Sequence, residues 1–229
     1  MIEASPPAPR TDAPNESARL VTRFVTRRRR SVLVEAIQRR GLRVVESLDL
    51  LAEDGLRRLA TQSFWLLVGS GIAYTGLDVA ARSVHGAGPL LGGGSPLLRG
   101  ATLLLANAAA YIIMLPVHEA LHASTILVLG GRPRFGLKLP LAAYCTAPGQ
   151  LFTRNGYLAI AAAPVVVLTL AGAVATWVAP DLGACILLGL AGNISGAVAD
   201  LWAIARIRHL PATALIEDTA TGYSAYTLA

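Results

Sequence analysis

Four long apolar stretches, almost free of charge, constrain this chain more than any other feature of its sequence. They cover about residues 59–77, 100–131, 155–180 and 182–205, and the only charged side chains inside them are Glu119 and Asp200. A helix of about 20 apolar residues spans the hydrocarbon core of a bilayer. Charged residues make up only 15% of the chain, whereas a soluble domain carries about 25%. The sequence therefore predicts an all-α membrane protein built on a four-transmembrane-helix bundle.

The charged residues divide the chain into two parts. Residues 1–58 hold 12 of the 20 Lys and Arg residues and 8 of the 14 Asp and Glu residues. Residues 1–18 are rich in Pro, Ala and Ser and are expected to be disordered, whereas Val44, Val45, Leu48 and Leu51 fall on one face of a helix over residues 43–54. We therefore expect a polar N-terminal region, residues 1–58, that is partly disordered and then helical, followed by a membrane-embedded domain, residues 59–229.

The excess of basic residues gives the chain an isoelectric point near 9.9. In a soluble protein, such a value and the run Arg27–Arg30 would suggest a nucleic-acid partner. Beside a membrane, the same run is attracted to anionic headgroups on the cytoplasmic surface. We adopt this second interpretation and expect membrane lipid, and no nucleic acid, as a partner.

The positions of Arg and Lys also predict the orientation of the helices. If the N-terminus is cytoplasmic, six basic residues of the later loops and the tail share its side: Arg132, Arg134, Lys138, Arg154, Arg206 and Arg208. Only Arg82 and Arg99 lie on the other side. Because cytoplasmic loops carry the excess of Lys and Arg, we expect an integral membrane protein with both termini in the cytoplasm.

Residues 118–122 read His-Glu-Ala-Leu-His inside the second apolar stretch. On a helix, His118 and His122 lie one turn apart, so their imidazoles point the same way and can bind one Zn²⁺. Glu119 is offset by about 100° and can reach a water on the metal. This pattern predicts a catalytic zinc site with Glu119 as general base. In the alternative interpretation, both histidines bond to neighbouring helices and Glu119 is neutral or paired.

A catalytic zinc site needs a third protein ligand, and Asp200 is the expected one. His118 lies 18 residues after Gly100 and Asp200 lies 18 residues after Leu182, about 27 Å along each helix. The two helices run parallel, so these residues should meet at one depth, near the cytoplasmic edge. Alternatively, Asp200 could pair with Arg206 or Arg208. The other candidates for the third ligand are Glu217, Asp218 and His209 in the C-terminal tail.

Two further residues could belong to the site. Asn193 precedes Asp200 by two helical turns and could hydrogen-bond a substrate backbone or orient a ligand, or serve only helix packing. Residues 132–154 form a link that is long for a turn and could fold back toward the metal as a hairpin or re-entrant segment. Cys145 lies in this link and could be an extra ligand, although we favour a small buried thiol.

Several segments of the chain resemble a known family. The segments PVHEALH, AAYCTAPGQ, GNISGAVADLW and LPATALIEDT resemble uncharacterised prokaryotic membrane proteins described as "putative zincin peptidases". More distantly, the chain is similar to the site-2 protease class of intramembrane zinc metalloproteases. This resemblance implies His118, His122 and Asp200 as zinc ligands and Glu119 as the catalytic acid and base. The distant class has Leu-Asp-Gly at its aspartate and Asn-x-x-Pro before it, whereas this chain has Ala199-Asp200-Leu201 and no such proline after Asn193.

We therefore expect a membrane-embedded zinc metalloprotease that hydrolyses peptide bonds at or near the cytoplasmic membrane edge. Its substrate would be a transmembrane or membrane-proximal protein. The alternative is a non-catalytic metal-binding membrane protein, or a small transporter in which Glu119 and Asp200 relay protons.

Overall fold

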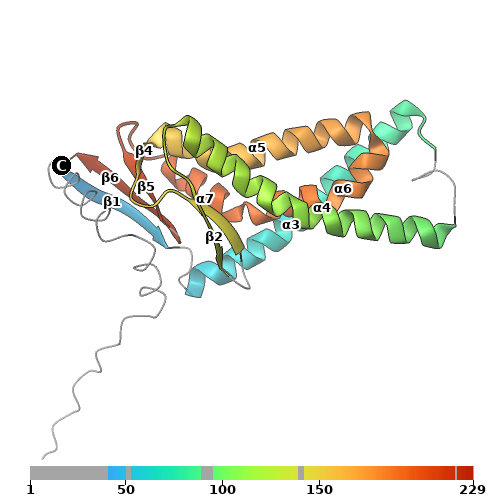
Figure 1. The fold of residues 1–229 in the computed structure, drawn as a ribbon, viewed down its shortest axis with the longest axis horizontal. Coiled ribbons are helices and arrows are strands. Elements are labelled where there is room, and N and C mark those ends of the chain that lie inside the picture. The colour runs from blue at the N-terminus through green and yellow to red at the C-terminus, as the bar shows by residue number, and fades with distance from the viewer. Residues whose placement is uncertain (1–40, 50–52, 89–94, 139–141, 220, 229) are drawn as a thin grey trace, which may run out of the picture.

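Four helical spans and a small sheet make up the computed structural model of the protein (Figure 1), which describes residues 41–49, 53–88, 95–138, 142–219 and 221–228. The helices are α3 (Glu53–His85), α4 (Pro96–Val128), α5 (Arg154–Val178), α6 (Pro180–Gly196) and α7 (Val198–Ile207). The strands are β1 (Leu42–Asp49), β2 (Arg134–Lys138), β3 (Ala142–Thr146), β4 (Leu151–Thr153), β5 (Leu215–Thr219) and β6 (Gly222–Leu228).

Four helical segments are long and apolar enough to cross a membrane: Gly55–His85, Pro96–Val128, Arg154–Val178 and Pro180–Ile207. They correspond to the four expected spans. The first segment begins earlier and ends later than the expected residues 59–77, because the charged residues near its ends do not interrupt the helix. Near its far end, Arg82 bonds to Asp78 and Asp181 at 2.8 Å each. The last segment is interrupted at Ala197, between α6 and α7.

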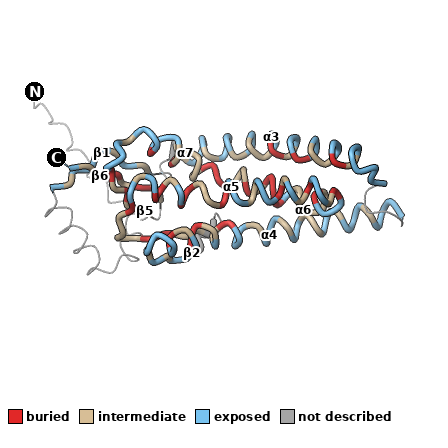
Figure 2. Tube along the Cα trace, turned by 90° about the horizontal axis from the view of Figure 1, so that it is seen from above, coloured by how far each residue is buried: buried red, intermediate tan, exposed pale blue. Residues whose placement is uncertain are grey.

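Helix α6 is the centre of the bundle, with α3, α4 and α5 packed around it. The tube view places α3 and α4 on opposite sides, with α5 and α6 between them (Figure 2). The contact between α4 and α6 is close because Gly189 has no side chain. A Cβ at Gly189 would lie 2.9 Å from the backbone oxygen of Ala110.

A four-stranded antiparallel sheet, in the order β1-β6-β5-β4, closes one end of the bundle (Figure 1). Its buried residues pack with α4, α5 and α7 in one hydrophobic core that includes Ile126, Tyr157, Ile207, Ile216 and Tyr223. The expected bundle of four long apolar helices is confirmed, but the fold is not all-α. Strands β1, β5 and β6 from the two ends of the chain, together with β4 from the link before α5, form a sheet that caps the helices.

The helix expected over residues 43–54 is also wrong, because residues 42–49 form β1. This strand pairs with β6 from Leu42↔Leu228 to Asp49↔Gly222. Its apolar residues fit a strand as well as a helix, and only Leu48 packs against the core, whereas Val44 and Val45 are exposed. Residues 50–52 of that expected helix, the segment 1–18 and the run Arg27–Arg30 lie outside the described residues.

The link between the second and third spans contains a hairpin, which confirms one of the two expected forms. Strands β2 and β3 pair antiparallel, from Arg134↔Thr146 to Lys138↔Ala142. Strand β3 packs against α4, the helix that carries His118 and His122. Thr153 then begins α5 by accepting a hydrogen bond from the Gly156 N–H at 3.1 Å, as N-terminal caps do.

Candidate metal centre

Three side chains from two helices converge at one point near the sheet end of the bundle. His118 and His122 project from α4, and Asp200 lies in the first turn of α7. The Nε2 atoms of the two rings are 3.2 Å apart, and Asp200 Oδ2 is 3.3 Å from the first and 3.4 Å from the second. The expected meeting of these residues is confirmed, and together they could hold a metal ion.

The other nitrogen of each ring is fixed by a buried hydrogen bond. His118 Nδ1 lies 2.9 Å from Asn193 Oδ1, and His122 Nδ1 lies 2.8 Å from the backbone oxygen of Ile160. The Ile160 carbonyl can only accept, so His122 Nδ1 carries a proton and donates it. His118 Nδ1 does the same when Asn193 presents its oxygen, as it does here. In the neutral ring, Nε2 is then left with a lone pair. The site thus presents two imidazole lone pairs and a carboxylate oxygen to one another, an arrangement that a cation stabilises.

The spacing of these atoms fits zinc. A tetrahedral zinc ion has bonds of about 2.0–2.1 Å to nitrogen and oxygen ligands, which places those ligand atoms about 3.3–3.4 Å apart. The triangle formed by the two Nε2 atoms and Asp200 Oδ2 has sides of 3.2, 3.3 and 3.4 Å. Two nitrogens and one oxygen also match a catalytic zinc site, which keeps its fourth position for water.

Glu119 stands beside this triangle but is not part of it. It is half-buried, and its carboxylate accepts a hydrogen bond from the backbone N–H of Cys145 on β3. The hairpin of β2 and β3 therefore holds Glu119 next to the two histidines. In this position Glu119 interacts electrostatically with both rings.

The other candidate ligands bond elsewhere. Glu217 accepts a hydrogen bond from the Tyr226 hydroxyl, and the Arg208 guanidinium donates one to His209. Arg206 lies 3.6 Å from Glu46, so the alternative pairing of Asp200 with Arg206 is not found.

Two of the ionisable groups near the centre lie outside the membrane-spanning helices and have shifted pKa values. Burial, reinforced by the nearby carboxylates of Glu119 and Asp218, raises the pKa of the Cys145 thiol to about 12. A thiol of this kind stays protonated at neutral pH, which disfavours a ligand role, although Cys145 is half-buried rather than buried as expected. Burial raises the pKa of Asp218 to about 6. Its oxygens accept hydrogen bonds from the Ala147 N–H and the Tyr157 hydroxyl, each at 3.0 Å.

The carbonyl of Ile160 could not be identified from sequence, because any residue type has a backbone carbonyl. Asn193, one of the expected site residues, places its oxygen 2.9 Å from His118 Nδ1. Its Nδ2 is buried and finds no hydrogen-bond partner among the described residues. Asn193 therefore keeps two unused N–H donors on this nitrogen.

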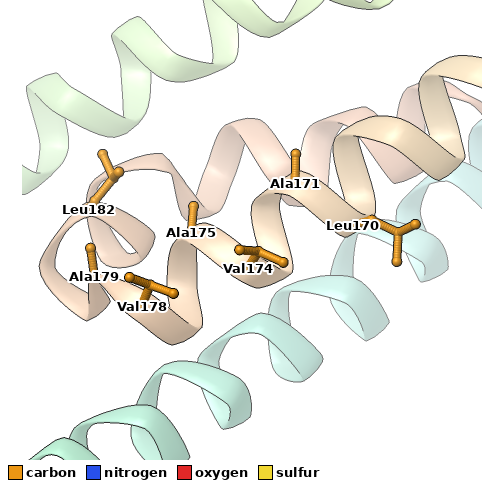
Figure 3. A pocket seen from close by; sticks show the side chains of 7 residues that line it. All are labelled: Leu170, Ala171, Val174, Ala175, Val178, Ala179 and Leu182. Carbon is orange, nitrogen blue, oxygen red and sulfur yellow. The ribbon is translucent and has the colours of Figure 1, made fainter.

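A separate apolar hollow lies at the turn between α5 and α6 (Figure 3), which is at the end of the bundle away from the sheet (Figure 1). Its lining residues are all aliphatic: Leu170, Ala171, Val174, Ala175, Val178, Ala179 and Leu182. None of them carries a group that could bind a metal or transfer a proton. We assign no chemistry to this hollow.

Comparison with known proteins bears on the same part of the chain. Residues 111–215 match a protein family described as "Putative zincin peptidase". The matched segment contains His118, Glu119, His122, Asn193 and Asp200, and it confirms the first resemblance drawn from the sequence. No curated protein and no solved structure matches the chain.

Proposed function

We propose that this protein is a membrane-embedded zinc metalloprotease that hydrolyses peptide bonds at the cytoplasmic edge of a prokaryotic cell membrane. The observation that carries the proposal is the triangle of His118, His122 and Asp200, whose sides of 3.2–3.4 Å suit one zinc ion. The family match and the four apolar helices support it. The resemblance to the site-2 protease class agrees with a substrate that lies in or beside the membrane.

The proposed roles follow from the geometry. His118, His122 and Asp200 would hold zinc, which when bound lowers the pKa of water toward about 7 and polarises a carbonyl oxygen. Glu119 takes the proton from the attacking water and returns it to the leaving amine. Asn193 and the carbonyl of Ile160 keep both rings in the tautomer that offers Nε2. The unpartnered Nδ2 of Asn193 would donate to a substrate carbonyl once substrate binding uncovers this buried atom.

The Glu119→Gln substitution tests the proposal. Glutamine has nearly the shape of glutamate but does not accept the proton, so zinc should stay bound at one ion per chain. Cleavage should fall by about 10²–10⁴-fold, as expected for the loss of a general base. The measurements are metal analysis of the purified chain, and cleavage of labelled casein and of a panel of single-span membrane proteins.

Glu217→Gln is the matched control, because Glu217 bonds to Tyr226 and lies outside the metal group. It should keep both zinc and cleavage. A wild-type chain without zinc, or a Glu119→Gln variant that cleaves as fast as wild type, would contradict the proposal. A proton-relay transporter would show no cleavage in the wild type and would lose flux in the variant.

A further inference from the structure

The two histidines of the metal group are held in different ways. His118 bonds to a side chain, that of Asn193, whereas His122 bonds to the backbone oxygen of Ile160 in the middle of α5. Both Ile160 and His122 are buried. Water therefore does not readily replace the Ile160 oxygen as the partner of His122 Nδ1. The bond between this oxygen and His122 Nδ1 decides how the ring is oriented.

A carbonyl inside an α-helix is not normally available for such a bond, because it accepts the N–H of the residue four positions later. For Ile160 that residue is Pro164, which lies inside α5 and is fully buried. Proline has no N–H, and its ring presses against the carbonyl four residues before it. The Ile160 carbonyl is thus freed from its helical bond and turned away from it by the same residue.

We infer that Pro164 is a positioning residue of the metal centre: it releases the Ile160 carbonyl to fix His122 with Nδ1 protonated and Nε2 directed at the metal. This inference rests on the proposed metal site. It assigns to Pro164 a role separate from packing, even though its ring touches neither metal nor substrate.

A second proline offers a comparison. Pro116 in α4 frees the carbonyl of Ile112 in the same way, but the Ile112 side chain is exposed. Pro116 therefore frees a carbonyl without serving the metal group.

The Pro164→Ala substitution tests the inference. Alanine supplies an N–H that competes with His122 for the Ile160 oxygen, so the ring is held less firmly. Complete loss of the hydrogen-bond partner of a metal-binding histidine costs about 10–100-fold in metal affinity. Because a carbonyl has two lone pairs, we expect a loss near tenfold. The measurement is the affinity of the full chain, purified in detergent, for Zn²⁺ and Co²⁺ in competition with a chelator.

The same substitution in two backgrounds separates positioning from general damage. In His118→Ala, Pro164→Ala should weaken Co²⁺ binding further by a similar factor. In His122→Ala, it should change nothing, because the ring through which it acts is gone. Pro116→Ala is the matched control and should leave the affinity within about twofold of wild type. An unchanged affinity in Pro164→Ala, an equal loss in Pro116→Ala, or a loss that persists without His122 would overturn the inference.

A measurement on the wild-type chain keeps the test valid even if Pro164→Ala does not fold. Nitrogen-15 NMR of histidine-labelled, metal-free protein reports which ring nitrogen holds the proton. The His122 signal is assigned by its loss in His122→Asn. We expect Nδ1 to carry a proton, and a ring whose only proton lies on Nε2 would overturn the inference. If wild-type protein binds no metal at all, the proposed function fails, whereas metal binding that ignores Pro164 overturns only this inference.

Discussion

A neutral imidazole has one lone pair, and the nitrogen that keeps the proton decides where that lone pair points. In this protein the decision is made outside the metal group, by Asn193 and by Ile160. The residues that choose the tautomer are therefore as necessary to the site as the residues that would touch the metal. The protonation of the nearby acid Asp218 is likewise set by its surroundings.

The half-buried carboxyl group of Asp218 leads to a prediction about pH. Its pKa is raised from 3.8 to about 6 in the folded protein, so between these values the folded state binds more protons than the unfolded state. The free energy of unfolding should therefore fall as pH rises through this window, by about 3 kcal/mol in total. Asp218→Asn resembles the protonated acid and should remove this dependence.

The measurement is the thermal unfolding midpoint of both proteins in detergent at pH 7.5 and pH 5. Because the histidines titrate in both proteins, the difference between the two midpoints isolates Asp218. Wild-type protein should gain stability relative to Asp218→Asn when the pH is lowered. A gain by the variant instead would contradict the assignment of a raised pKa.

At this scale, much of the metal centre could be predicted from sequence. Helical rise and membrane thickness are fixed quantities, so counting residues brought His118 and Asp200 to one depth. The spacing of the two histidines placed them on one face. The backbone contact of His122 could not be predicted, because it depends on how α5 lies against α4.

Individual elements are positioned by close contacts, of which the pairing of α4 with α6 bears most directly on the centre. Gly189 of α6 touches the backbone of Ala110 in α4. Gly189→Ala should force the helices apart and destabilise the fold by about 1–3 kcal/mol. Because α4 carries both histidines, the affinity for Zn²⁺ should fall as well.

Gly100→Ala in α4 is the control, because a Cβ at Gly100 meets nothing within 4 Å. Alanine favours a helix by up to about 1 kcal/mol over glycine, so this variant should be as stable as wild type or slightly more stable. Thermal unfolding of the two variants in detergent measures the contrast. Equal unfolding midpoints for Gly189→Ala and Gly100→Ala would mean that the contact between Gly189 and Ala110 does not hold α4 in place.

Strand β1 could not be predicted from the sequence. Residues 42–49 carry apolar side chains that suit either a helix or a strand, and the choice is made by β6, which follows about 180 residues later. Such pairing is not visible in a local pattern. The hairpin of β2 and β3 was easier to predict because its strands are neighbours in the chain and too short to span a membrane.

At the scale of the whole molecule, the sheet relates the two ends of the described chain. Strand β1 pairs with β6, so both lie at the same end of the bundle (Figure 1). Four helices that each cross the membrane, an even number, also return the chain to the side of the membrane on which the first helix begins. The two observations agree with the placement of both termini in the cytoplasm that the basic residues predict.

Fusions in a bacterial host test this topology. Green fluorescent protein at the C-terminus should fluoresce, and alkaline phosphatase at the same position should be inactive. The same reporters inserted after Gly88, between α3 and α4, should give the opposite result. An active phosphatase at the C-terminus would place the sheet, and with it the metal centre, on the outer side of the membrane.

The pairing of β1 with β6 also sets an order of events during synthesis. The first strand leaves the ribosome roughly 180 residues before its partner, a delay of about 10–40 s at ordinary rates of translation. All four helices can insert in this interval, while β6 is still unmade. Until then β1 has no partner strand, and only a chain translated through Leu228 can complete the sheet beneath the candidate metal centre.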